Sequence, residues 1–333
     1  MTSSNSEPPR LGEFALIAKL FAPLAAKNEG ALGLKDDAAT LLLPPGEELV
    51  VTVDALVEGV HFLRDDTAQL IAKKALRVNL SDLAAKGAQA NNYLLALSLP
   101  GWIDDSWLER FAAGLAEDQT RYGVTLLGGD TTSTPGPLTL SITALGSIPA
   151  GRMLRRSGAK PGDLVFVSGT IGDAGAGLEM LEGKASKLSA EMRENLIRRY
   201  RLPEPRLALG RGLIGIASAA LDVSDGLIAD LGHIAEVSGV HVVIDAPSVP
   251  LSAELAGLWG RETQGLLRAA TAGDDYELAF TAAPPARVAI ADAARASGVA
   301  VSEIGRVEAG AGVELTDEAG RAIAVARPGF THF

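Results

Sequence analysis

Length, composition and charge limit the classes of protein that this sequence can encode. Its 333 residues, 47% of them hydrophobic and 21% charged, are enough for two folded domains with full cores. A formal net charge of −11 argues against a sequence-independent nucleic-acid binder, because such binding depends on Lys and Arg that neutralise phosphates. The absence of cysteine excludes disulfides, thiolate zinc sites and a cysteine nucleophile.

The amino end and the apolar runs bear on location. Residues 1–10 lack a basic start and an apolar core, so they predict a flexible tail and not a signal peptide. No apolar run approaches the roughly 18 residues of a membrane span. We therefore expect a cytoplasmic protein that binds neither membranes nor nucleic acid.

The spacing of apolar residues predicts an α/β arrangement in the first half of the chain. The predicted order is roughly β-β-α-β-α-β-β, which differs from the regular alternation of a dinucleotide-binding fold. The predicted elements are a helix over 11–27, strands over 39–43 and 49–54, a helix over 67–88, a strand over 93–99, a helix over 104–122, a strand from Val124, and a strand over 138–147.

A segment rich in Pro, Gly and Arg between residues 147 and 163 predicts a domain boundary. We place the boundary after residue 148, which gives an N-terminal domain over 11–148 and a C-terminal domain over 149–333. The second domain is predicted to contain a strand over 164–168, a glycine-rich turn over 169–177, helices to about 219, an acidic turn over 221–227, a helix to 237, a strand over 241–244, a helical stretch to 270, a turn over 273–277, a strand over 278–281, a helix to 297, and closing strands.

An apolar strand is followed abruptly by the residues Gly128, Gly129, Asp130, Thr131 and Thr132. The glycines allow a ligand to approach the backbone, and the side chains after them offer oxygens to a metal or a phosphate. When this stretch is considered alone, a strand followed by a simple cap explains it equally well.

Other aspartates also follow apolar runs, at strand ends or turns, where each alone is most often a turn or cap residue. Two like charges about 4 Å apart repel by roughly 4 kcal/mol at an effective dielectric near 20, so converging carboxylates need divalent cations. Mg2+ is commonly shared between carboxylates and substrate phosphates, which favours phosphoryl transfer from a nucleotide. The candidates are Asp36, Asp37, Asp54, Asp82, Asp130, Asp222, Asp225, Asp274 and Asp275.

Two features near these acids allow two interpretations each. Asp82 lies on one stripe of the predicted helix with Asn79 and Lys86, so it either pairs with Lys86 at the surface or belongs to the acidic site. The basic segment 152–156 is either a solvated loop or a phosphate contact.

Motifs for other chemistries are ambiguous or absent. The glycines of 169–177 either begin a helix or hold an anion, and we leave them unassigned. His61 is either a core residue or a ligand contact near Asp54. The sequence contains no Walker pattern, no dinucleotide fingerprint and no nucleophile elbow.

Taken together, these stretches resemble the thiamine-monophosphate kinase family of the aminoimidazole-ribonucleotide-synthetase-like superfamily. The resemblance covers nearly the whole chain, and so many motifs in the right order make it specific. The matching stretches are 12–17, 36–39, 54–62, 79–85, 128–132, 156–163, 222–227, 274–278 and 329–333.

The resemblance implies two mixed-sheet α/β domains, the first forming the interface of a homodimer, and ATP-dependent phosphorylation of thiamine monophosphate with several Mg2+ ions. Asp130 and Arg156 would be catalytic, and Asp274 departs from the family, which usually has Glu there. The implied metal ligands are Asp37, Thr52, Asp54, Asp82, Asp130, Asp222 and Asp225; the ATP contacts are Tyr122, Gly129, Asp130, Arg156 and Ser224; the thiamine contacts are His61, Asp274 and Phe330.

The acceptor itself refines the expected mechanism. The oxygens of a phosphate monoester are already largely anionic at pH 7, so no general base is needed. Mg2+ and Arg156 would instead screen the repulsion between two phosphates and align them for in-line attack. We therefore expect direct transfer without a phosphoenzyme.

Two alternatives stay open. One is another ATP-dependent member of the superfamily, although selenophosphate synthetase usually carries an amino-terminal Cys or selenocysteine, and aminoimidazole ribonucleotide synthetase leaves residues 329–333 unexplained. The other is a non-enzymatic regulator, which would bind Mg-nucleotide tightly without consuming ATP.

Overall fold

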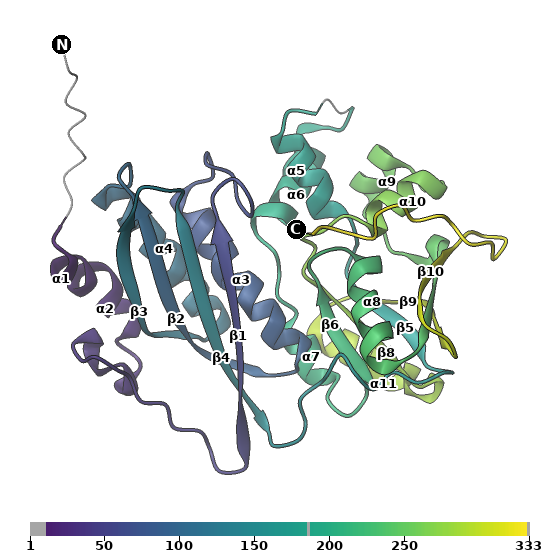
Figure 1. The fold of residues 1–333 in the computed structure, drawn as a ribbon, viewed down its shortest axis with the longest axis horizontal. Coiled ribbons are helices and arrows are strands. Elements are labelled where there is room, and N and C mark those ends of the chain that lie inside the picture. The colour runs from purple at the N-terminus through teal and green to yellow at the C-terminus, as the bar shows by residue number, and fades with distance from the viewer. Residues whose placement is uncertain (1–10, 185–186, 332–333) are drawn as a thin grey trace. The chain divides into compact units, whose positions relative to one another are not determined.

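The computed structural model describes residues 11–184 and 187–331, and the chain divides into two compact units. One unit runs to Leu83 and then from Ala90 to Ser147, and the other contains Ala84–Gln89 and the chain from Ile148 onward. Each unit is built on its own sheet (Figure 1). The predicted tail over 1–10 lies outside the described residues, and the boundary after residue 148 stays a prediction.

The first unit is a four-stranded sheet in the order β1-β4-β2-β3, in which β2 and β3 are parallel. Helices α3 and α4 lie against one face of this sheet (Figure 1) and meet at Gly114, where a Cβ would lie 2.7 Å from the Gln69 carbonyl oxygen. The elements are α1 (Glu13–Leu16), a π-helical segment (Ile17–Phe21), α2 (Ala22–Ala25), a 3-10 segment (Glu29–Leu34), β1 (Glu47–Val57), α3 (Ala68–Ala85), β2 (Gln89–Pro100), α4 (Asp105–Tyr122), β3 (Thr125–Thr134) and β4 (Thr139–Pro149).

One prediction for this unit is wrong. Residues 39–43 form no strand, because no strand of the sheet pairs with these leucines and Pro44 and Pro45 follow them; the order is therefore β-α-β-α-β-β. The helix predicted over 11–27 is present over Glu13–Ala25 and is π-helical at Ile17–Phe21, just before Pro23, which has no N–H to donate. The other predicted helices and strands of this unit are present.

The second unit is a six-stranded mixed sheet in the order β10-β7-β9-β5-β8-β6, in which β7 and β10 are parallel and the other described pairs are antiparallel. The elements are β5 (Leu164–Ser168), α5 (Asp173–Leu181), α6 (Ala190–Arg201), α7 (Leu207–Gly212), β6 (Ala219–Val223), α8 (Leu227–Ser238), β7 (His241–Asp245), a 3-10 turn (Ala246–Ser248), α9 (Ala253–Trp259), α10 (Thr263–Ala270), β8 (Glu277–Ala282), a 3-10 turn (Pro284–Ala286), α11 (Arg287–Ser297), β9 (Val301–Glu308) and β10 (Gly312–Thr316).

Apolar layers cover both faces of this second sheet. Leu221 of β6 packs in the layer that contains α8, whereas its neighbour Ala220 packs in the layer that contains α7 and α11. Side chains that alternate along a strand explain why a sheet buried on both faces has continuous apolar runs. The two units thus match the predicted pair of α/β domains.

Membrane insertion through a helix has no support among the described residues. None of their helices combines the length and the apolar composition that crossing a bilayer requires.

Helices α5 and α6 approach so closely at Gly177 that a Cβ there would lie 2.2 Å from the Leu196 carbonyl oxygen. We expect Gly177→Ala to lower the free energy of unfolding by about 1–3 kcal/mol through overpacking. Gly257→Ala in α9 is the matched control, because its Cβ would lie 3.8 Å from the nearest atom, on Leu188. The control should gain about 0.5–1 kcal/mol from the better helix former. Denaturant unfolding followed by circular dichroism measures the free energy of unfolding of both variants. An equal increase in the two variants would contradict the tight contact at Gly177.

Candidate functional site

The first group of predicted ligands meets where β1 lies against α3. The Thr52 Oγ1 donates a hydrogen bond to Asp82 Oδ2 at 2.5 Å, and the Asp54 backbone N–H donates to Asn79 Oδ1 at 3.0 Å. Residues two apart on a strand share a face, and so do residues three apart on a helix. Thr52 and Asp54 on the strand therefore face Asn79 and Asp82 on the helix. We call Thr52, Asp54, Asn79 and Asp82 the β1 cluster. Three of its members were predicted as metal ligands.

The β1 cluster contains two carboxylates that influence each other. Burial, together with the neighbouring Asp82 carboxylate, raises the pKa of Asp54 to about 6. A bound cation would remove this cost, because an opposite charge favours the ionised form. A hydroxyl and two carboxylates are oxygen ligands of the type that Mg2+ prefers, so the cluster fits the predicted metal. Asn79 was not predicted as a site residue, although it lies on the same helical stripe as Asp82.

Of the two interpretations of Asp82, the structure shows the carboxylate with Thr52. Lys86 donates from Nζ to the Ala220 backbone carbonyl at 3.1 Å. Asp82 therefore belongs to a polar cluster at the sheet.

Asp130 lies on the opposite edge of the same sheet. Strands β4 and β2 separate β3 from β1, which puts the two edge backbones about 14 Å apart at the usual strand spacing. Asp130 is exposed, and its Oδ1 accepts from the Thr131 N–H at 2.9 Å. At Gly129 a Cβ would lie 1.9 Å from the Leu95 carbonyl oxygen, so only glycine fits there. Within this unit the structure keeps Asp130 apart from the β1 cluster.

Asp37 and His61 occupy turns of the first unit. Asp37 is exposed, and its N–H donates to Asp36 Oδ1 at 2.8 Å. His61 lies in the turn after β1, where its Nδ1 accepts from the Val57 N–H at 3.1 Å. This bond fixes the orientation of the imidazole ring in the turn.

Tyr122 ends α4 beside two guanidinium groups. Arg77 and Arg121 lie 5.5 and 5.4 Å from the centroid of its ring. Arg77 is itself fixed by a buried ion pair with Asp118, with Nε and Oδ2 2.7 Å apart. These contacts hold the ring of the predicted ATP contact in a defined position.

In the second unit, three segments meet at the carboxyl end of β6: residues 222–226, residues 273–277 and residues 327–331. Backbone hydrogen bonds join them, and we call this group the turn cluster. The bonds run from the Asp274 N–H to the Ser224 carbonyl at 2.8 Å, from the Tyr276 N–H to the Val223 carbonyl at 2.7 Å, and from the Phe330 N–H to the Asp225 carbonyl at 2.9 Å.

The turn cluster brings together five of the predicted site residues, although they lie far apart in the sequence. Gly329 makes part of this approach possible, because a Cβ there would lie 2.4 Å from the Asp225 carbonyl oxygen. The five residues are Asp222, Ser224, Asp225, Asp274 and Phe330.

Asp230, which was not predicted, holds one of these turns. Its Oδ2 accepts from the N–H groups of Ser224, Asp225 and Gly226 at 3.0, 3.0 and 3.1 Å. Burial and then the Asp225 carboxylate raise the pKa of Asp230 to about 7. A carboxylate in the first turn after Gly226 was the available sequence signal. Asp225, Asp230 and His233 also offer ligand atoms within 4.8 Å of one another.

The glycine-rich stretch 169–177 leads into α5, and a carboxylate of the protein already occupies the start of that helix. Asp275 accepts from the Gly172 N–H at 2.6 Å and from the Ala174 N–H at 3.3 Å. These are the amides that an anion would bind. The stretch is therefore the start of a helix, with Asp275 in place of a bound anion.

Arg156 lies in the segment between β4 and β5 and is exposed. This segment is anchored on the second sheet, because the Ala220 N–H donates to the Arg155 carbonyl at 2.8 Å and the Ser238 Oγ donates to the Arg156 carbonyl at 3.4 Å. An exposed guanidinium on an anchored backbone is compatible with the predicted phosphate contact.

Comparisons with known proteins agree with these features. Two family models, AIR synthase related protein, N-terminal domain and C-terminal domain, match residues 35–148 and 160–318. The chain is 45% identical to the thiamine-monophosphate kinase of Caulobacter vibrioides over 96% of its own length and 90% of the relative's.

Two solved structures are similar over nearly all of both chains. The thiamine-monophosphate kinase of Stenotrophomonas maltophilia K279a has a TM-score of 0.83 and 42% identity, and the match covers 94% of this chain and 98% of that one. AaThiL complexed with AMPPCP and TMP has a TM-score of 0.76 and 33% identity, over 98% of this chain and 100% of that one.

The raised pKa of Asp54 predicts a pH dependence of stability in the metal-free protein. The ordinary Asp value is 3.8, so between that pH and about 6 the folded chain holds a proton that the unfolded chain lacks. The contribution of Asp54 to the free energy of unfolding should therefore fall as the pH rises from about 4 to about 6, by up to about 3 kcal/mol, and then level off. Asp54→Asn should lack this part of the pH dependence and keep the part that comes from Asp230. Denaturant titrations in EDTA at each pH measure the difference in free energy of unfolding between the two proteins. A difference that does not change with pH would contradict the raised pKa of Asp54.

Proposed function

Because the chain belongs to the thiamine-monophosphate kinase family, we propose that it transfers the γ-phosphate of ATP to thiamine monophosphate, giving thiamine diphosphate and ADP. The observation that carries the proposal is the 45% identity to a thiamine-monophosphate kinase over 96% of this chain. A second support is AaThiL complexed with AMPPCP and TMP, at 33% identity over 98% of this chain. Because ATP is the phosphoryl donor, we propose that the reaction takes place in the cytoplasm.

Several Mg2+ ions are part of this proposal. When bound, they supply positive charge that offsets the phosphate oxygens of the donor and the acceptor. Thr52, Asp54 and Asp82 fit one such ion, since burial and the Asp82 carboxylate raise the pKa of Asp54 and a cation would favour its ionised form. The other proposed ligands are Asp37, Asp130, Asp222 and Asp225.

The nucleotide contacts follow from backbone shape and charge. Gly129 lets β3 lie close to the Leu95 carbonyl, where a Cβ would lie 1.9 Å from that oxygen, and Asp130 follows it on the strand. Arg156 offers an exposed guanidinium, whose planar set of donors suits phosphate oxygens. Ser224 and Tyr122 complete the proposed ATP contacts.

The thiamine contacts suit a cationic substrate. Thiamine carries a positively charged thiazolium ring, which a carboxylate and the face of an aromatic ring both attract. Asp274 provides the carboxylate and Phe330, which is 45% exposed, provides the ring. Their backbone N–H groups both donate to the turn 222–226, to the Ser224 and Asp225 carbonyls. His61, in the turn after β1, is the third proposed contact.

The reaction needs no general base from the chain. The acceptor phosphate is already anionic at pH 7, so the difficulty is to bring two negative groups together in line. Arg156 would contribute one charge that offsets this repulsion, and Asp130 would orient the donor phosphate through the ion that it binds. We propose direct transfer, and a labelled phosphoprotein on the reaction path would contradict it.

The open face of the first sheet supports a homodimer. Leu49, Val51 and Val53 lie on one face of β1 and are 42%, 53% and 59% exposed. A row of apolar side chains on an exposed edge strand is typical of an interaction surface. We propose that a second copy of the chain covers this row.

The decisive test of the function is an assay with the purified protein, ATP, Mg2+ and thiamine monophosphate. We expect thiamine diphosphate and ADP in equal amounts, and no turnover when Mg2+ is withheld. Asp130→Asn should lower kcat at least 100-fold with an unchanged circular dichroism spectrum, because the amide cannot replace the metal-binding charge. If thiamine itself is phosphorylated and no diphosphate forms, the assignment fails; full activity of Asp130→Asn removes that residue from the site.

The dimer proposal makes a separate prediction. Val51→Lys should produce monomers, because it places a charge in the apolar row of β1. Val288→Lys in α11 is the control, since Val288 is 72% exposed and lies in the second unit. Light scattering after size exclusion gives the mass of each. A wild-type monomer, or a dimer that persists in Val51→Lys, would contradict the proposed interface.

A further inference from the structure

The turn 273–277 has an unusual backbone. Asp274 and Tyr276 have φ angles of 68° and 50°, in the left-handed region that residues with a side chain rarely adopt. Aspartate tolerates this region better than most residues, but a bulky tyrosine does not. A backbone of this kind persists only where its surroundings fix it.

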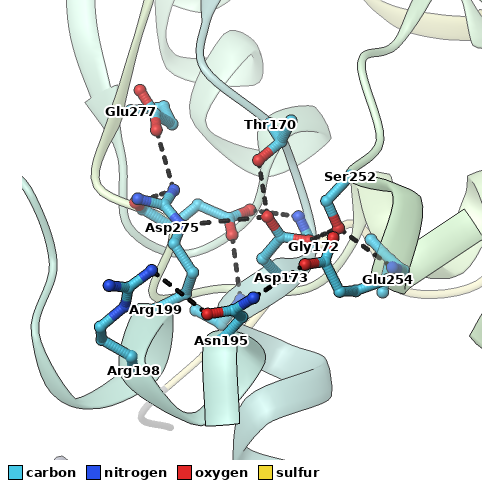
Figure 2. A network of polar contacts seen from close by, with 12 residues as sticks. Thr170, Gly172, Asp173, Asn195, Arg198, Arg199, Ser252, Glu254, Asp275 and Glu277 are labelled. Atoms are coloured by element: carbon cyan, nitrogen blue, oxygen red, sulfur yellow. Dashed lines mark hydrogen bonds and ion pairs between the residues drawn. The ribbon is translucent and has the colours of Figure 1, made fainter. Parts of the chain in front are cut away.

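Asp275, between these two residues, is fixed in the interior of the second unit. Its side chain is almost fully buried, and its two oxygens accept from the Gly172 and Ala174 N–H groups at the start of α5. Figure 2 shows this carboxylate beside Gly172 and Asp173. The centre of the turn is thus attached to a helix that lies about 100 residues earlier in the chain.

Arg199 of α6 spans the turn from the other side. Its Nη2 donates to the Asp275 backbone carbonyl at 3.4 Å and to Glu277 Oε1 at 2.8 Å, and its Nε lies 3.9 Å from Asp173 Oδ2 (Figure 2). One planar guanidinium therefore contacts the centre of the turn, the end of the turn and the start of α5.

Glu277 is held at the end of the turn by further donors. It is fully buried and accepts from Arg206 Nε at 2.7 Å and from Ser168 Oγ at 2.5 Å. The same Ser168 Oγ accepts from the Leu278 N–H at 2.9 Å. Both ends of the strained backbone are therefore anchored, one to residues 223–224 and the other to β5.

We propose that Asp275 and Arg199 are positioning residues for the thiamine end of the substrate. They hold the turn 273–277 in the left-handed conformation that presents Asp274 next to Ser224 and Phe330. This inference rests on the proposed function, because it takes thiamine monophosphate as the ligand of Asp274. Both residues act through the turn and not by touching the substrate, since Asp275 is buried and the Arg199 side chain is only 18% exposed.

The role predicts a selective kinetic defect. When the turn relaxes, Asp274 leaves the place where it meets the thiazolium ring, so binding of thiamine monophosphate weakens. Of the proposed ATP contacts, Tyr122, Gly129, Asp130 and Arg156 lie on other segments of the chain. Ser224 adjoins the turn, but its backbone N–H is held separately by Asp230. The KM for thiamine monophosphate should therefore rise without a matching rise in the KM for ATP.

The test uses two mild variants of the full chain. Asp275→Asn keeps the size of the side chain but puts an NH2 group against one of the two backbone donors. Arg199→Lys keeps the charge but loses the planar set of donors that reaches three partners. Ser252→Ala is the matched control, because Ser252 Oγ donates to Asp173 Oδ1 at 2.6 Å in the same network without touching the turn.

We expect both variants to raise the KM for thiamine monophosphate at least fivefold and to change the KM for ATP less than twofold. Hydrogen exchange of a peptide over 272–278 should be at least tenfold faster in both, because the bonds of the Asp274 and Tyr276 amides open more often. Ser252→Ala should leave both KM values and this exchange rate unchanged.

Several results would overturn the inference while the proposed function stands. With an active wild-type protein, the inference is overturned if the two variants show an unchanged KM for thiamine monophosphate. It is also overturned if they show an equal rise in both KM values, or unchanged hydrogen exchange over 272–278. Failure of the function is distinguishable, because the wild-type protein would then form no thiamine diphosphate, and the inference would fall with it.

Discussion

The second unit depends on carboxylates that accept hydrogen bonds from the backbone. Asp230 accepts three N–H groups at the start of α8, and Asp275 accepts two at the start of α5. Helix starts have N–H groups without partners in the helix, and a buried carboxylate satisfies them where water cannot reach. Because the chain supplies these acceptors itself, the hydrogen bonds that shape the turns 222–226 and 273–277 lie within the second unit. A ligand that contacted these turns would meet a preorganised backbone.

The β1 cluster differs from these helix starts, because its two carboxylates lie near each other. Asp54 and Asp82 lie near each other, and the raised pKa of Asp54 reflects burial and this neighbour. The first unit therefore stores an electrostatic cost that a cation removes, whereas the second unit has already satisfied its helix starts internally. One cluster thus has an unfavourable charge on a buried carboxylate, and the other has its backbone donors satisfied.

Much of the fold and part of the site could be predicted from the sequence, for local reasons. Spacing along one helix indicated that Asn79 and Asp82 share a stripe, because this period is a property of the backbone. That Thr52 and Asp82 belong to one site was implied only by the family resemblance. The placement of Asp130 could not be predicted, since the order β1-β4-β2-β3 is decided by tertiary pairing. The strand expected over 39–43 failed for the same reason: three leucines fit a strand, but no partner strand lies beside them. In the pair Asp274 and Asp275, nothing in the sequence says which carboxylate turns inward, and Asp275 was therefore not assigned.

The bond between the Phe330 N–H and the Asp225 carbonyl ties the end of the chain to a turn that lies about 100 residues earlier. Residues 327–331 form no helix or strand, yet this bond makes them part of the fold of the second unit. A protease that removes this segment would therefore also loosen the turn 222–226 to which it is bonded.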